Sequence, residues 1–170
     1  MSEGEDRGDA PFLLEESWRP LFDGRSLNGW HRRGRYPFLW STTRGVIWDG
    51  RNSPDSLVGV PVAGDRMINT GRGADLITDA KLGDVELYLE FMLARNSNSG
   101  VYLNGHYEVQ IRDSFGVAMP TFDDCGGIHK RAREGFQGSA PLQNASRPPG
   151  QWQSLHIWFQ APRFDANSNK

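Results

Sequence analysis

The segment at residues 84–94 restricts the fold of this chain more than any other. Its apolar residues fall on every second position, Val85, Leu87, Leu89, Phe91 and Leu93, and they alternate with Glu86, Tyr88, Glu90 and Met92. A helix would spread these apolar side chains around its circumference, whereas a strand presents them all on one face. The segment therefore predicts a half-buried β-strand.

Other segments extend this pattern. Residues 46–48 form a short apolar run before an Asp-Gly turn, and residues 152–164 place Leu155, Ile157 and Phe159 on one face until Pro162 ends the strand. Residues 51–73 are rich in Gly, Pro and Asn and predict a long surface loop, with short strands near 57–60 and 66–68. Residues 115–150 hold no long periodic element. No helix longer than one or two turns is predicted.

Composition supports an all-β fold and excludes several classes of protein. The 170 residues include 20 Gly, 10 Pro and 19 aromatic residues, which suits many turns and strands and points to an antiparallel β-sandwich of jelly-roll type. The 19 basic and 21 acidic residues argue against a nucleic-acid-binding protein. No apolar run approaches the ~20 residues of a membrane span. A lone Cys125 excludes an internal disulfide and a Cys-rich zinc site.

The N-terminal residues differ from the rest of the chain. Residues 1–11 are acidic and almost free of large apolar side chains, so they predict a disordered leader. No basic segment followed by an apolar one marks a secretory signal. We expect a leader over residues 1–17 and one β-sandwich domain over residues 18–170.

A hairpin at residues 101–113 carries the candidate site. Asn104-Gly105 between two alternating runs predicts a two-residue turn, which would pair Leu103 with His106 and Val101 with Glu108. One face would then carry apolar and aromatic residues suited to a core: Tyr102, Tyr107, Val109 and Ile111. The other face would carry acid–base and hydrogen-bonding groups: His106, Glu108, Gln110 and Arg112. A polar face of this kind is suited to the floor of a ligand groove, although polar faces on antiparallel strands are most often only solvated.

Five blocks in order give this chain a specific resemblance. They are LFDGRSLNGW, LITDAKLGDVELYLEFML, NSGVYLNGHYEVQIRDSFG, CGGI and NASRPPGQWQSLHIWFQAPRFD. The chain resembles the 3-keto-disaccharide hydrolase domain family from about Trp18 to its last residues. The resemblance implies a concanavalin-like β-sandwich jelly roll, and a carbohydrate substrate that a partner sugar 3-dehydrogenase has oxidised at C3. Relatives are often periplasmic or secreted. They also continue with further strands, so we expect this sandwich to be incomplete at the C-terminus.

The implied chemistry assigns roles to residues. A C3 ketone acidifies the proton on C2, so a base can remove it, the C1 substituent leaves by elimination, and water adds back. Ordinary glycosidases instead use paired carboxylates, which this sequence does not obviously provide. We expect Glu108 to be the base, with His106 as the second candidate. The expected substrate-binding residues are Asn98, Gln110, Asp113, Asn144 and Arg163, although Asp113 could also act as a cap and Arg163 could pair with an acid.

Other features leave alternatives open. A divalent metal is possible, since the sequence offers candidate ligand types without a tight ligand spacing: His106, Glu108, Asp113, Asp123, Asp124, Cys125 and His129. His129 stands where the family pattern leads us to expect an aromatic residue such as Tyr, which puts substrate specificity in question. The competing functions are a non-catalytic carbohydrate-binding module that stacks sugars on Trp30, Trp40 or Trp158, and a degenerate domain without activity.

Overall fold

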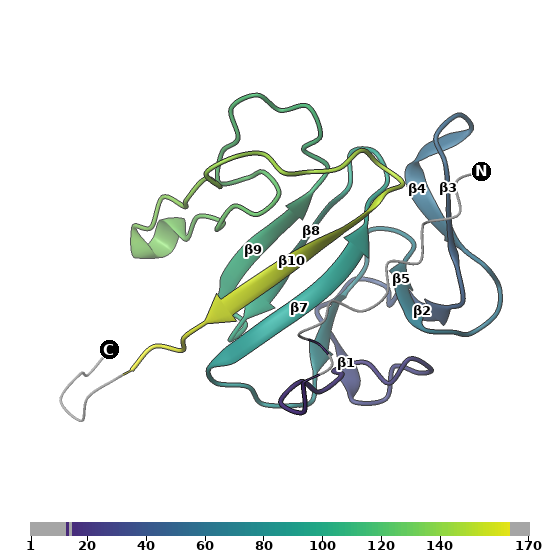
Figure 1. Ribbon diagram of the computed structural model, residues 1–170, viewed down its shortest axis with the longest axis horizontal. Coiled ribbons are helices and arrows are strands. Elements are labelled where there is room, and N and C mark those ends of the chain that lie inside the picture. Colours follow the sequence, from purple (N-terminus) through teal and green to yellow (C-terminus); the bar gives the residue numbers. More distant parts are fainter. Residues whose placement is uncertain (1–12, 14, 164–170) are drawn as a thin grey trace. The chain divides into compact units, whose positions relative to one another are not determined.

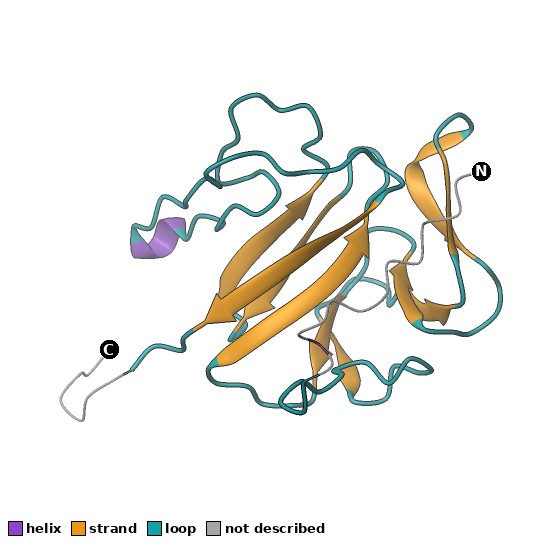
Figure 2. Cartoon of the chain, in the orientation of Figure 1, coloured by secondary structure: helices purple, strands orange, loops and turns teal. Residues whose placement is uncertain are grey.

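The computed structural model describes residue 13 and residues 15–163, and this part of the chain is all-β (Figure 1 and Figure 2). It contains no helix of seven or more residues. The strands are β1 (Trp30–Arg33), β2 (Trp40–Thr43), β3 (Val46–Asp49), β4 (Ser53–Gly59), β5 (Arg66–Asn69), β6 (Asp75–Thr78), β7 (Val85–Met92), β8 (Asn98–Leu103), β9 (Tyr107–Arg112) and β10 (Trp152–Phe159), with a 3-10 turn η2 (Ala132–Glu134) before β10.

The strands form antiparallel pairs in two compact units, residues 1–80 and 81–170. The first unit holds the pairs β1–β6, β2–β5 and β3–β4, and the second holds β7–β10 and β8–β9. This arrangement confirms the all-β prediction and is consistent with a β-sandwich. Most of the expected leader, and residues 164–170 at the C-terminus, lie outside the described residues.

The prediction of a long loop over residues 51–73 is wrong in its extent, because β4 and β5 both lie within it. The short strands expected near 57–60 and 66–68 are present, and β4 begins earlier than expected, at Ser53. β4 pairs with β3, and the register shifts between Trp48 and Asp49. The indole Nε1 of Trp48 donates to the carbonyl of Pro54 at 2.8 Å. Short strands that contain Pro or Gly have little alternation of their own and depend on a partner strand for their hydrogen bonds. Trp30–Arg33, Trp40–Thr43 and Asp75–Thr78 also escaped prediction, because a run of four residues carries too little alternation to mark a strand.

The two long strands of the second unit agree with the sequence pattern. β7 and β10 pair over eight residues, from Trp152 opposite Met92 to Phe159 opposite Val85. Side chains alternate between the faces of a strand. Leu87, Leu89, Leu155 and Ile157 therefore share one face, while Glu86, Tyr88, His156 and Trp158 share the other.

The predicted register of the β8–β9 hairpin is wrong by one residue. Leu103 pairs with Tyr107, and Tyr102 pairs with Glu108, so the turn contains His106 as well as Asn104 and Gly105. Asn104 and Gly105 both have left-handed backbones, with φ of 54° and 62°, and the His106 amide donates to the Leu103 carbonyl at 3.1 Å. A three-residue turn moves Tyr102 from the predicted core face to the face of Glu108.

In the second unit, each strand of the β8–β9 and β7–β10 pairs has one face toward the core and one face away from it. Leu103, Val109 and Ile111 are buried, and the ring of Tyr107 lies 5.5 Å from that of Phe159 on β10. Because neighbouring residues on a strand point in opposite directions, Glu108 points away from β10 and Trp158 points away from β9. The two residues lie on opposite sides of this unit.

Candidate functional site

The segment at residues 126–129 runs along β9 and completes the candidate site. The amide of Gln110 donates to the Gly127 carbonyl at 2.8 Å, and the amide of His129 donates to the Glu108 carbonyl at 2.9 Å. Val109 and Ile128 form an antiparallel bridge. Partners across antiparallel strands share a face, so His129 stands beside Glu108.

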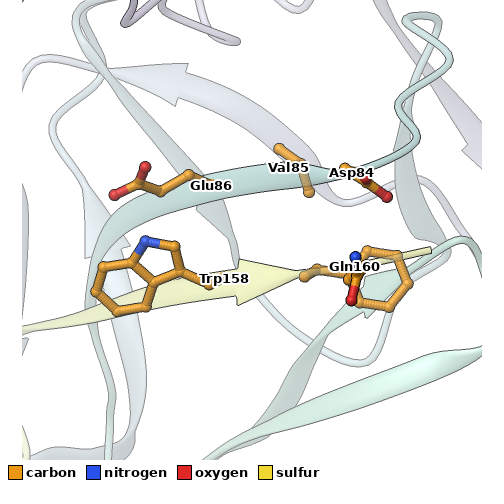
Figure 3. Close-up of a pocket in the computed structure, with 6 residues that line it drawn as sticks. Asp84, Val85, Glu86, Trp158 and Gln160 are labelled. Atoms are coloured by element: carbon orange, nitrogen blue, oxygen red, sulfur yellow. The ribbon is translucent and has the colours of Figure 1, made fainter.

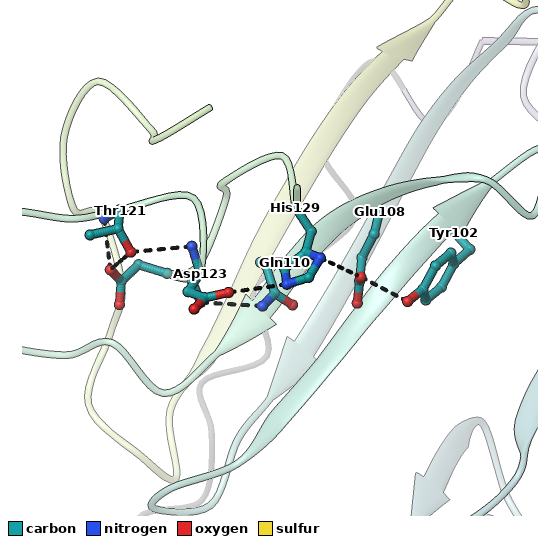
Figure 4. A network of polar contacts seen from close by, with 7 residues as sticks. Tyr102, Glu108, Gln110, Thr121, Asp123 and His129 are labelled. Atoms are coloured by element: carbon teal, nitrogen blue, oxygen red, sulfur yellow. Dashed lines mark hydrogen bonds and ion pairs between the residues drawn. The ribbon is translucent and has the colours of Figure 1, made fainter. Parts of the chain in front are cut away.

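Glu108 lies between two hydrogen-bonding side chains (Figure 4). The Tyr102 hydroxyl donates to Glu108 Oε2 at 2.7 Å, and His129 Nδ1 lies 3.5 Å from the same oxygen. The Glu108 side chain is 17% exposed, so it is shielded but reachable. Gly100 leaves room for it, because a Cβ at residue 100 would stand 2.5 Å from Glu108 Oε1. The arrangement holds the Glu108 carboxylate in place, with Oε2 bound by Tyr102 and His129 and Oε1 lying over Gly100.

The other ring nitrogen of His129, Nε2, contacts the carboxylate of Asp123. His129 Nε2 lies 3.1 Å from Asp123 Oδ1, so the imidazole bridges two carboxylates. The side-chain N–H of Gln110 Nε2 donates a hydrogen bond to the Asp123 carbonyl at 3.3 Å. Gln110 is only 3% exposed, yet its Oε1 has no hydrogen-bond partner among the described residues. A buried acceptor without a partner costs about 1–3 kcal/mol, so Gln110 lies beneath the surface of this face and not at its ligand-accessible edge.

The loop that carries Asp123 is fixed by Asp124. The Asp124 carboxylate accepts hydrogen bonds from Ser114 Oγ at 2.9 Å and from the amide and hydroxyl of Thr121 at 2.7 and 3.0 Å. Partial burial would raise the pKa of Asp124, but these hydrogen bonds outweigh it and hold the pKa below its ordinary value. The Cys125 amide donates to Ser114 Oγ at 3.0 Å. Asp124 and Cys125 thus have structural contacts in this loop.

The structure places His106 in the hairpin turn rather than on the strand. Its Nε2 lies 3.0 Å from Glu134 Oε1 and 2.9 Å from Arg131 Nη1. Arg131 also pairs with Glu134 at 2.7 Å and lies over the Tyr107 ring at 4.4 Å. His106 and Glu134 are 45% and 46% exposed. We call His106, Arg131 and Glu134 the turn cluster.

The predicted substrate-binding residues do not gather in one place. Asn98 lies on β8 in register with Arg112, on the face of Glu108. Asp113 accepts the Asn96 amide at 3.0 Å, which makes it a turn cap. Asn144 donates to the carbonyls of Ser114 and Val117 and accepts the Ser146 amide, so its side chain ties loops together.

Arg163 pairs with Asp84, the alternative that the sequence left open. Asp84 directly precedes β7, so Arg163 lies with the β7–β10 pair.

Sequence reasoning did not place Tyr102, Asp123 and His129 in a network around Glu108, and it named Asp123 and His129 only as candidate metal ligands. The predicted register assigned Tyr102 to the core. His129 had a visible signal, since it follows the Gly126-Gly127-Ile128 block at a position where an aromatic residue was expected. Nothing in the sequence pattern placed Asp123 beside it.

The described side chains do not assemble a metal centre. Over residue 13 and residues 15–163, no group of three or more His, Cys, Asp or Glu could hold a metal ion. The candidate ligands that do meet, Glu108, His129 and Asp123, are joined by direct ion pairs. In the same part of the chain, no helix is long and apolar enough to cross a membrane.

Comparison with known proteins gives a family and one curated relative. The family model described as a 3-keto-alpha-glucoside-1,2-lyase-like domain matches residues 17–169. A 3-keto-disaccharide hydrolase from Bacteroides thetaiotaomicron is 26% identical over 160 residues, covering 81% of this chain and 50% of the relative. The chain thus spans about half the length of that protein. No solved structure matches the chain at a significant level.

Proposed function

Since this chain belongs to the family of 3-keto-alpha-glucoside-1,2-lyase-like domains, we propose that it cleaves the glycosidic bond of 3-keto-glycosides. The curated relative is named a 3-keto-disaccharide hydrolase, which supports a 3-keto sugar as the substrate. The observation that carries the proposal is the half-buried Glu108 carboxylate, which Tyr102 and His129 hold on one face of the hairpin. Such a group suits the removal of a proton next to a ketone.

The reaction begins at C2. Glu108 takes the C2 proton, and the electron pair of that bond moves into the enolate of the C3 ketone. The enolate then re-forms the ketone and expels the C1 oxygen, which leaves a double bond between C1 and C2. Water adds its oxygen to C1 and a proton to C2, so the net result is hydrolysis. The product is a 3-keto sugar together with the free alcohol.

The leaving oxygen needs a proton, and we assign its delivery to Tyr102. Its hydroxyl lies 2.7 Å from Glu108 Oε2. Tyr102 gives its proton to the departing oxygen and recovers one from the newly protonated Glu108. The C2 proton is thereby relayed to the leaving group, and both side chains return to their starting states. Tyr102 is 54% exposed, so a substrate can reach it.

The remaining groups orient the base and the sugar. His129 contacts Glu108 through Nδ1 and Asp123 through Nε2, which fixes the position of the carboxylate. Asn98 on the same face is assigned to contact the sugar, and the buried Gln110 supports the floor beneath Glu108 through its bond to the Asp123 carbonyl. His106 remains the second candidate for the base. Asp113 and Asn144, which hold turns and loops of the second unit, contribute to the site indirectly. Arg163 pairs with Asp84 and is given no role in the reaction.

The substrate chemistry implies a preceding oxidation. A 3-keto-glycoside arises when a sugar dehydrogenase removes two electrons and two protons from the C3 hydroxyl. We therefore propose that a sugar 3-dehydrogenase supplies the substrate.

The second candidate function, a carbohydrate-binding module, has support at one residue. Trp158 is 69% exposed, whereas Trp30 and Trp40 are half-buried and donate their indole N–H groups to the carbonyls of Leu21 and Ala74. A binding module would retain sugar without releasing any alcohol. A half-buried acid beside a hydroxyl and an imidazole favours the enzyme.

The test compares p-nitrophenyl glucoside with its 3-keto form. We expect the chain to release nitrophenol from the keto compound and to leave the parent glucoside intact. Parallel reactions with added divalent cation and with chelator determine whether a metal contributes. Equal release of nitrophenol from both compounds would contradict the elimination route. Release from neither compound would contradict the proposal that the chain cleaves 3-keto-glycosides.

A further inference from the structure

A pocket lies on the side of the second unit that faces away from Glu108. It has a volume of about 370 Å³ and is lined by Asp84, Val85, Glu86, Trp158, Phe159 and Gln160. Trp158 pairs with Glu86 and Phe159 with Val85, so Gln160 falls opposite Asp84 at the end of the strands. By alternation, Asp84, Glu86, Trp158 and Gln160 share one face. Figure 3 shows the Trp158 indole and the Glu86 carboxylate on neighbouring strands.

Among the described residues, one aromatic ring stacks on the indole of Trp158. The His156 ring lies against it, with centroids 3.8 Å apart and planes inclined by 34°. His156 Nε2 donates to Glu86 Oε1 at 2.8 Å, which fixes the imidazole in turn. Trp158 is nevertheless 69% exposed. A rigid ring with a free face is a surface on which a flat apolar group can stack with little loss of side-chain entropy.

Polar groups with unused hydrogen-bonding capacity among the described residues lie beside this ring. The Trp158 indole N–H and the Gln160 amide make no hydrogen bond to any described residue, and Glu86 uses only Oε1 for His156. The pocket therefore offers donors and an acceptor beside an aromatic face. A pyranose ring has the matching chemistry, because its C–H groups pack on an aromatic ring while its hydroxyls reach outward.

The carboxylates of the pocket argue against a cationic ligand. Asp84 accepts the Ala161 amide at 2.9 Å and pairs with Arg163. Glu86 accepts from His156. An ammonium group would compete with these partners, and a single indole is no aromatic cage. A neutral polyhydroxylated ligand can use the groups that remain available without displacing either contact.

We infer that the Trp158 face of β7 and β10 is a second carbohydrate-binding site, which stacks a neutral pyranose unit on the indole and holds its hydroxyls with Glu86 and Gln160. It lies apart from Glu108 and does not require a 3-keto sugar. A chain with both sites can hold a glycan on one side and act on a sugar on the other.

The test is calorimetric titration of the chain with maltohexaose and with cellohexaose, neither of which carries a ketone. At least one of them should bind with a measurable Kd. Trp158→Ala should weaken this binding about tenfold or more, and Trp158→Phe should weaken it less. The matched control is Phe115→Ala, which removes another exposed aromatic residue, 56% exposed, from the same unit and should leave Kd unchanged.

Several results would overturn the inference. One is the absence of binding to both sugars, and another is equal loss of affinity in Trp158→Ala and Phe115→Ala. Loss of sugar binding in Glu108→Gln but not in Trp158→Ala would place the sugar on the face of Glu108. Binding of choline without sugar binding would show a cation site. A concentration-dependent dimer that Trp158→Ala abolishes would show that a second copy of the chain covers this face. Because the titration needs no turnover, its failure is separate from failure of the proposed reaction.

Discussion

Glu108 and His106 come from the same hairpin, yet their surroundings differ in the ways that matter for a base. Glu108 is 17% exposed and contacts a hydroxyl and an imidazole, with the buried Gln110 on the same face. His106 is 45% exposed and shares its Nε2 with Arg131 and Glu134. The nitrogen that would take a proton is already engaged with a cation and an anion. Glu108 lies on β9, whereas His106 lies in the turn before it. The position at which the turn ends therefore decides which of two nearby acid–base residues enters the shielded network.

The largest effect is expected from Glu108→Gln. An amide keeps the size of the side chain but cannot accept the C2 proton, so kcat should fall by about 10³-fold. The measurement is release of nitrophenol from the 3-keto-glucoside, together with thermal unfolding to verify the fold. Activity close to that of the original chain would remove Glu108 from the mechanism.

Tyr102→Phe should have the next largest effect. The substitution removes the hydroxyl that we assign to the leaving oxygen, and a positioned acid contributes about 10²-fold. The loss should be smaller for a glycoside with a nitrophenol leaving group than for one with an alkyl alcohol, since nitrophenolate needs less protonation. Equal losses for the two substrates would show that Tyr102 only orients Glu108.

Gly100→Ala tests the geometry around Glu108 without changing any acid or base. The added Cβ would stand 2.5 Å from Glu108 Oε1 and 2.9 Å from its Cγ. The flexible carboxylate must swing aside, so kcat should fall about tenfold while stability changes little. The matched control is Gly83→Ala, because a Cβ at residue 83 meets nothing within 4 Å. Equal activity of the two variants would show that the position of Glu108 is not important.

His106→Gln is expected to have the smallest effect, within about twofold, because the turn cluster lies outside the proposed relay. Assay of the same 3-keto-glucoside measures it. A loss as large as that in Glu108→Gln would reverse the assignment and make His106 the base.

The sequence predicted the parts of the fold that carry strong alternation. β7 and β10 follow from period-two patterns of apolar residues, which require one buried face. The short strands β1, β2 and β6 show no such pattern, because their pairing depends on partners up to 48 positions away, as Trp30 opposite Thr78 shows.

The site was predictable only in part. The pattern found Glu108 and Gln110, because their face follows from β9 alone. It misplaced Tyr102, because left-handed backbones at both Asn104 and Gly105 still allow a turn of two or three residues. It could not place Asp123 beside His129, because that contact depends on a loop that Ser114, Thr121 and Asp124 hold in shape.

The central claim is that cleavage begins with removal of the proton on C2, and an isotope effect tests it most directly. A 3-keto-glucoside that carries deuterium at C2 can be compared with its protium form in single-turnover release of alcohol. The account predicts a primary isotope effect well above one, which shows that the C2 bond breaks as the glycoside is cleaved. An isotope effect of one, with cleavage at the same rate, would contradict it.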